Sequence, residues 1–213
     1  MQTKVFGIGW AKTGVTTLGR CLRDLGYRHH GQRLDLVDDL GTGDLATADL
    51  SRILAVAAEH DAFTDWPWIL LYRQLDAAFP GSRFVLTLRD PDRWLKSYRS
   101  MIERLPPATP ELSGRRRILY GLPFPDVTDA MLLDRRERHD AAVRDWFRGR
   151  PEVLLTVDWE AGDGWERLCG FLAAPVPTTP FPHENRGVPS STHRPLRPPA
   201  RRDRRSGESF PAS

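Results

Sequence analysis

The sequence predicts an α/β fold, a parallel β-sheet flanked by helices and arranged in three layers. Two observations lead to this prediction. Short apolar runs alternate along the chain with segments in which apolar residues recur at helical spacing, and such alternation favours parallel strands joined by right-handed crossovers. In addition, 213 residues are enough for one domain with a single core and a ligand cleft.

Three apolar runs are predicted strands. They are "KVFGI", "RFVLTLR" and "EVLLTV", at residues 4–8, 83–89 and 152–157. Their apolar residues are almost continuous, as expected for strands of a parallel sheet that is covered on both faces.

Helical spacing predicts helices at residues 15–25, 47–60, 68–79, 91–103, 127–147 and 165–172. Gly26 supplies a stop for the first of these helices, and Asp90 can cap the fourth. Residues 105–116, which contain "PPATP", are predicted to form a loop. Arginines of the long helix alternate with acidic residues, which predicts a solvated face for Arg135, Arg136, Arg138 and Arg144.

The basic residues are unevenly distributed. The formal net charge is +3, but residues 186–213 contain seven arginines against Asp203 and Glu208, so the rest of the chain is slightly acidic. A nucleic-acid partner is therefore not expected. Because the segment is rich in Pro, Arg and Ser, we predict a domain at residues 1–187 and a disordered basic tail at 188–213.

The sequence also predicts the cellular location of the protein and the state of its two cysteines. No run approaches the ~20 apolar residues of a membrane span, and no secretory signal is recognisable, so we expect a cytoplasmic protein without a membrane partner. Cys21 and Cys169 lie in separate predicted helices without C-x-x-C spacing, which predicts buried free thiols.

The stretch "GIGWAKTGVTT", residues 7–17, joins the first predicted strand to the first helix. Such a turn presents backbone N–H groups and the positive end of a helix dipole to an anion. Lys12 adds a charge, and Thr16 and Thr17 add hydroxyl donors. In the magnesium-dependent pattern G-x-x-x-x-G-K-[ST] the lysine follows the last glycine, whereas Lys12 precedes Gly14. The order predicts a phosphate cradle without a metal.

A second anion-binding group is predicted at Arg89. This residue lies at the carboxyl end of its strand, where open α/β sheets bind ligands. Ser97 falls in the second turn of the following helix, near enough to share a ligand group with Arg89. A ligand with two separate anionic clusters fits this arrangement.

The stretches "GWAKTGVTTLG", "LRDPDRWLKSY" and "FPHENRG" resemble the three nucleotide-binding elements of sulfotransferases that use 3'-phosphoadenosine 5'-phosphosulfate (PAPS). The overall pattern is similar to the smaller, bacterial-type P-loop sulfotransferases, and the resemblance spans residues 3–187. It implies a P-loop-type fold and transfer of a sulfuryl group from PAPS to a hydroxyl or amine of a small-molecule acceptor, without a metal.

The resemblance also implies roles for individual residues. Lys12 would neutralise charge on the departing phosphate, Arg89 and Ser97 would hold the 3'-phosphate, and Arg186 with Gly187 would close over it. The residues implied in donor binding are Gly9, Ala11, Lys12, Thr13, Gly14, Val15, Thr16, Thr17, Arg89, Ser97, Arg186 and Gly187. Val15 stands where the family usually has threonine, and the lost hydroxyl is expected to weaken donor binding roughly tenfold to a hundredfold.

The catalytic base is predicted to be Asp65. It precedes a proline and lies among aromatic residues, which can raise the pKa of a carboxyl and shape an apolar pocket. An alternative role is a cap for a helix that starts at Pro67. His29 and His30 are further candidates for the base. Of the nearby tryptophans, Trp66 and Trp68 are candidate acceptor contacts, and residues 33–44 and 105–127 are expected to build the acceptor pocket.

Two other functions remain open at this level. Phosphate loops also occur in small-molecule or nucleotide kinases that use ATP with magnesium. A nucleotide-binding protein without catalysis is the third possibility, in view of Val15.

Overall fold

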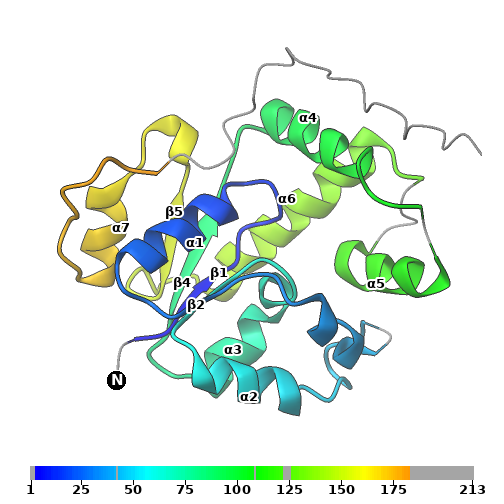
Figure 1. The fold of residues 1–213 in the computed structure, drawn as a ribbon, viewed down its shortest axis with the longest axis horizontal. Coiled ribbons are helices and arrows are strands. Elements are labelled where there is room, and N and C mark those ends of the chain that lie inside the picture. The colour runs from blue at the N-terminus through cyan, green and yellow to red at the C-terminus, as the bar shows by residue number, and fades with distance from the viewer. Residues whose placement is uncertain (1–2, 42, 108, 122–125, 183–213) are drawn as a thin grey trace, which may run out of the picture.

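The computed structural model describes residues 3–41, 43–107, 109–121 and 126–182. Its centre is a five-stranded parallel sheet with the strand order β2-β3-β1-β4-β5 (Figure 1). This confirms the predicted α/β fold. The strands are β1 (Val5–Gly7), β2 (His29–His30), β3 (Ala62–Thr64), β4 (Arg83–Thr87) and β5 (Leu154–Val157).

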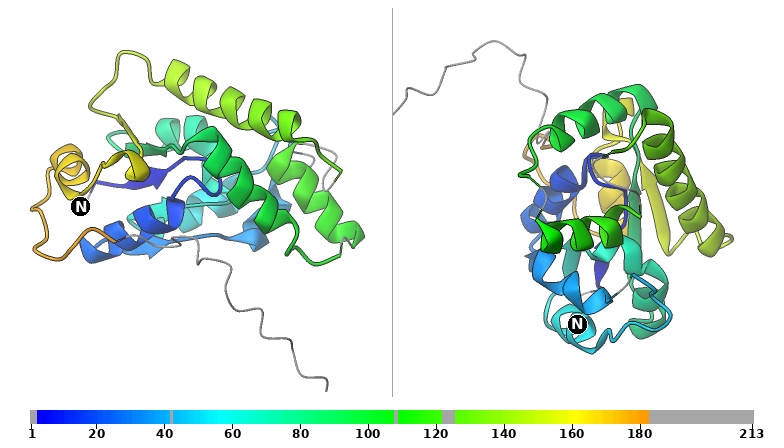
Figure 2. Two further views of the ribbon diagram at one scale, coloured as in Figure 1. Left: turned by 90° about the horizontal axis from the view of Figure 1, so that it is seen from above. Right: turned by 90° about the vertical axis from the view of Figure 1, so that its right-hand side faces the viewer.

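Helices cover both faces of the sheet, which gives the predicted three layers (Figures 1 and 2). Helices α2 (Ser51–Glu59), α3 (Tyr72–Ala78) and α6 (Asp129–Trp146) cover one face, and α1 (Val15–Asp24) and α7 (Trp165–Leu172) cover the other. Successive strand residues serve opposite cores, since their side chains alternate between the faces. Phe6 and Phe84 stack in the first core with ring centroids 5.4 Å apart, whereas Val5 and Val85 belong to the second.

A third buried cluster lies at the carboxyl end of the sheet. It joins Trp10 and Trp66, which follow β1 and β3, to helices α4 (Pro91–Ile102) and α5 (Pro110–Tyr120). The rings of Trp10 and Trp66 meet edge to face at 5.1 Å, and Trp66 meets Tyr120 in the same way at 5.6 Å. Such aromatic pairs are directional, so this cluster fixes the walls of the cleft above the strands.

The prediction of a loop at residues 105–116 was wrong, because α5 begins at Pro110. Thr109 caps this helix by accepting a hydrogen bond from the amide of Leu112 (3.2 Å), and Gly121 ends it with a φ of 61°. Thr-Pro before a helix and Gly after it are the usual boundary signals. The prolines of this segment favour a loop, but Pro110 stands at the first position of a helix, where proline is well tolerated.

Other boundaries differ less. Within the predicted helix at 47–60, α2 begins only at Ser51, and the predicted helix at 68–79 divides into a 3₁₀ helix, η3 (Trp68–Leu71), and α3. The predicted free thiols are confirmed, since Cys21 and Cys169 are buried and unpaired. None of the helices in the described ranges combines the length and the apolar character that a membrane span requires.

Candidate functional site

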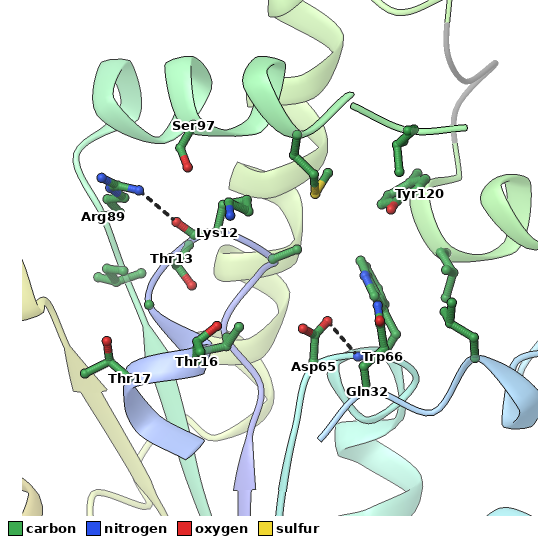
Figure 3. Close-up of a pocket in the computed structure, with 18 of the residues that line it drawn as sticks. Lys12, Thr13, Thr16, Thr17, Gln32, Asp65, Trp66, Arg89, Ser97 and Tyr120 are labelled. Atoms are coloured by element: carbon green, nitrogen blue, oxygen red, sulfur yellow. Dashed lines mark hydrogen bonds between the residues drawn. The ribbon is translucent and has the colours of Figure 1, made fainter. Parts of the chain in front are cut away.

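A cleft of about 830 Å³ lies above the carboxyl ends of β1 and β4 (Figure 3). After β1 the chain forms β2 and β3 on one side of β1 and then crosses to β4 on the other side, so the cleft lies at the point where the strand order reverses. Its volume is within the range of ligand pockets. The predicted residues Ala11, Lys12, Thr13, Gly14, Val15, Thr16, Thr17, Asp65, Arg89 and Ser97 all line it.

The two glycines of the loop serve different contacts. A Cβ at Gly14 would lie 2.4 Å from Cδ1 of Trp159, whose Nε1 donates a hydrogen bond to the Gly14 carbonyl (3.2 Å). A Cβ at Gly9 would lie 2.0 Å from Oγ1 of Thr87. Gly9 is absent from the cleft lining. Gly9 therefore packs closely against Thr87 of β4, and its predicted contact with the donor stays a prediction.

The loop is fixed through its carbonyl groups. Four carbonyl oxygens accept hydrogen bonds from side chains outside the loop. Besides Gly14, they are Ile8 from Nε2 of His139 (2.8 Å), Ala11 from Nε1 of Trp94 (2.9 Å) and Lys12 from Nη1 of Arg89 (3.3 Å). Gly14 stands at the N-cap of α1, and no described side chain caps this helix, so the first-turn amides of Val15, Thr16 and Thr17 have no helical partner. A rigid loop with free amides is suited to an anion.

Thr13 contributes to the rigidity of the loop. Its buried hydroxyl lies 2.6 Å from the Thr87 hydroxyl and donates to the Trp10 carbonyl (2.6 Å), and its amide also bonds to that carbonyl (3.2 Å). Thr13 nevertheless lines the cleft, and its predicted contact with the donor stays a prediction. Thr16 is exposed at the cleft, and Val15 is buried beneath it.

Lys12 and Asp65 face the cleft from the segments that follow the neighbouring strands β1 and β3 (Figure 3). Burial lowers the pKa of the Lys12 amine, as do the charges of Arg104 and Arg89, while Asp65 opposes this effect. Burial raises the pKa of the Asp65 carboxyl, against the amide of Trp66 and the charge of Lys12. Lys12 and Asp65 have φ values of 73° and 72°, a strained conformation for non-glycine residues that is often found at functional sites.

The alternative role of Asp65 as a helix cap was wrong. Helix η3 begins at Trp68 and has no side-chain cap, and the Asp65 carboxylate accepts instead from the amide of the next residue, Trp66 (2.9 Å). Trp66 lines the cleft as predicted, whereas the Trp68 indole donates to the Gly31 carbonyl (3.1 Å) and lies outside the lining. Of the two proposed acceptor contacts, only Trp66 reaches the cleft.

The two candidate histidines lie outside the main cleft. His29 contacts Thr64 (2.8 Å) and Arg23 (2.9 Å) beside a smaller cavity of about 200 Å³, and burial lowers its pKa to about 4. His30 contacts Arg33 (2.7 Å) and lines neither cavity. Asp65 is thus the candidate base that borders the cleft.

Arg89 is held against the loop. Its Nη1 donates to the Lys12 carbonyl and its Nη2 donates to Oε1 of Glu160 (2.7 Å), so the guanidinium points toward the cradle (Figure 3). The Nε atom of Arg89 is buried and has no hydrogen-bond partner among the described residues. Ser97 projects from α4 toward the same space (Figure 3). The two predicted anion-binding groups therefore adjoin one another.

The solvated face predicted for the long helix was wrong for two arginines. Arg136 is buried, lies 5.0 Å from the Trp94 ring and donates to the Arg89 carbonyl. Arg135 is half-buried over the Trp10 ring (5.3 Å). Helix α6 crosses the ends of β1 and β4, where its side chains donate hydrogen bonds to the carbonyls of Ile8 and Arg89. The charge pattern of the helix gives no sign of this crossing. Arg138 and Arg144 are exposed, as predicted.

The other half of the cleft is mainly apolar. Its lining comes from the segments expected to build the acceptor pocket and from α4, and it includes Leu34, Met101, Leu105, Leu112, Leu119 and Tyr120. The arginines on this wall have partners within the protein, since Arg115 pairs with Asp38 (2.5 Å) and Arg116 donates to the Pro106 carbonyl (2.8 Å). Arg186, Gly187 and the predicted tail lie outside the described residues.

Comparisons with known proteins agree with this geometry. The sequence model of a family described as "Sulfotransferase domain" matches residues 4–188, a range that contains the whole cleft. The chain is 28% identical over 144 residues to "Ava biosynthesis cluster protein M" of Aspergillus versicolor. That alignment covers 59% of this chain and 54% of the other protein, so the chain spans about half the length of this curated relative.

Proposed function

The chain belongs to the sulfotransferase domain family, as its motifs predicted, and on this premise we propose that it transfers a sulfuryl group from PAPS to a hydroxyl or amine of a small-molecule acceptor. The observation that carries the proposal is the contact between Arg89 and the Lys12 carbonyl. This contact places a guanidinium beside a cradle of free amides, as a nucleotide with phosphate groups at both ends of its ribose requires.

The residues present fit the donor. The uncapped first turn of α1 and the Lys12 amine suit the 5'-phosphosulfate, and Arg89 has a buried Nε without a partner in the described residues. Ser97 offers a hydroxyl on the same side of the cleft. PAPS, when bound, supplies an activated sulfuryl group and leaves as adenosine 3',5'-bisphosphate.

Two side chains are assigned to the transfer itself. Lys12 would stabilise negative charge on the bridging oxygen of the leaving phosphate, because its amine is held in a partly desolvated cleft where such an interaction is strong. Asp65 would accept the proton of the acceptor, since its raised pKa makes the carboxylate a better base than an exposed aspartate. The apolar half of the cleft would hold the body of the acceptor.

Calorimetric titrations test the donor assignment. We expect adenosine 3',5'-bisphosphate to bind more tightly than ADP, and to bind equally well with and without magnesium. Preferential binding of ATP with magnesium would refute the proposal and favour a kinase. Transfer of label from sulfur-labelled PAPS to a panel of phenols, alcohols and amines then tests catalysis. Tight donor binding without transfer to any member of a broad panel would indicate a nucleotide-binding protein instead.

A further inference from the structure

Glu160 lies where the second phosphate of the donor is expected. It belongs to a 3₁₀ helix, η4 (Trp159–Ala161), that follows β5 directly. The Asp158 carboxylate accepts hydrogen bonds from the amides of Glu160 (2.9 Å) and Ala161 (3.3 Å), which fixes this turn. Because β5 pairs with β4 in register, the turn lies beside Arg89. The pairing of β4 with β5 therefore determines where Glu160 lies.

The Glu160 carboxylate bridges two arginines. Its Oε1 lies 2.7 Å from Nη2 of Arg89, and its Oε2 lies 3.4 Å from Nη1 of Arg93. Arg93 stands on α4 one turn before Ser97, so both residues share a helix face, and both line the cleft. Arg93 is thus a further cation in the cleft, beside Lys12 and Arg89. The sequence motifs did not predict this position.

A phosphate and this carboxylate need the same donors. Arginine binds phosphate best through two N–H groups on one edge of the guanidinium. Nη1 of Arg89 is engaged by the Lys12 carbonyl and Nη2 by Glu160, so a phosphate at the outer edge of Arg89 would meet the carboxylate. Two anions at that separation repel each other strongly in a partly buried site.

We propose that Glu160 competes with the 3'-phosphate of the donor for Arg89 and Arg93, and that Arg93 is a further phosphate-binding residue. The inference rests on the proposed function, in which Arg89 binds that phosphate. Competition of this kind weakens the binding of nucleotides that carry a 3'-phosphate and leaves other nucleotides unaffected. It therefore favours departure of the bisphosphate product after transfer.

Glu160→Gln tests the competition without removing side-chain volume. We expect calorimetry to show adenosine 3',5'-bisphosphate binding about three- to tenfold more tightly, the equivalent of an exposed to half-buried ion pair. ADP, which lacks the 3'-phosphate, should bind as it does to the unaltered protein. Glu166→Gln is the matched control, because Glu166 is exposed in the first turn of α7 and outside the cleft lining. It should change neither affinity.

Arg93→Gln, combined with Glu160→Gln, tests the second part. The bisphosphate should bind about three- to tenfold more weakly than to Glu160→Gln alone, with ADP unchanged. Unchanged or weaker bisphosphate binding by Glu160→Gln would overturn the competition, and an unchanged double variant would overturn the role of Arg93. Unfolding midpoints of each variant verify that the fold is retained.

Arg89→Gln separates this inference from the proposed function. If Arg89→Gln abolishes a preference for bisphosphate over ADP while Glu160→Gln has no effect, the inference about Glu160 fails and the donor assignment stands. If the unaltered protein shows no such preference and Arg89→Gln changes nothing, the donor assignment fails, and the inference fails with it.

Discussion

Gly14→Ala offers a quantitative test of how the loop is held. The alanine would adopt a φ near 104°, and its Cβ would lie 2.4 Å from Cδ1 of Trp159. A left-handed conformation costs an L-residue about 1–2 kcal/mol. Displacing Trp159 would in addition break its hydrogen bond to the Gly14 carbonyl, at about 0.5–1.5 kcal/mol. We expect the free energy of unfolding to fall by about 1.5–3.5 kcal/mol.

Gly26→Ala is the matched control for this variant. Gly26 also has a left-handed φ, of 84°, but a Cβ there would meet no atom within 4 Å. Both substitutions reduce the entropy of the unfolded chain equally, so this effect cancels between them. Gly26→Ala should therefore destabilise the fold by about 1–2 kcal/mol, from backbone conformation alone.

Urea unfolding of both variants measures the difference, and titration with adenosine 3',5'-bisphosphate measures the effect on the site. Gly14→Ala should lose more stability than Gly26→Ala and should also bind the bisphosphate more weakly, because the start of α1 is displaced. Equal losses of unfolding free energy in the two variants would refute the reasoning, since the contact with Trp159 would then contribute nothing.

Three further predictions concern the cleft and its support. Lys12→Ala should lower turnover about a hundredfold or more while bisphosphate affinity falls less than about tenfold, and equal losses would argue against a role in the transition state. Asp65→Asn should slow transfer and leave bisphosphate affinity intact. Folding raises the pKa of Asp65 above its ordinary 3.8, so the free energy of unfolding falls as the pH rises above that value. The Asn variant should lack this fall and be more stable near pH 7 in urea titrations. Arg136→Met should destabilise by about 3–5 kcal/mol, since it leaves Asp140 buried without its cation (3.6 Å), whereas Arg138→Met should change stability by less than about 1 kcal/mol.

Local signals in the sequence predicted the half of the cleft that contains the glycine loop and Arg89. The glycine loop, the cap at Asp90 and the position of Arg89 at a strand end are each encoded within a few residues. β2 and β3 escaped prediction because runs of two and three residues are too short for a periodic pattern.

Longer-range features could not be predicted in this way. The burial of Arg136 depends on where α6 crosses the sheet. The contact between Arg89 and Glu160 depends on the pairing of Thr87 with Val157 in neighbouring strands, which no single segment encodes. Asp65 illustrates both cases. The sequence predicted its aromatic surroundings, but it did not show that Asp65 lacks a capping role.

The two sides of the cleft differ in how firmly they are attached to the sheet. His139, Trp94 and the Thr87 hydroxyl secure the loop to the framework, so little movement is available there. The opposite wall includes α5, which packs against the aromatic cluster at the end of the sheet and, through Ile118, against the first core. Under the proposed function, substitutions in that wall would change the shape of the acceptor cavity without disturbing nucleotide recognition, which makes it the natural place for substrate scope to diversify.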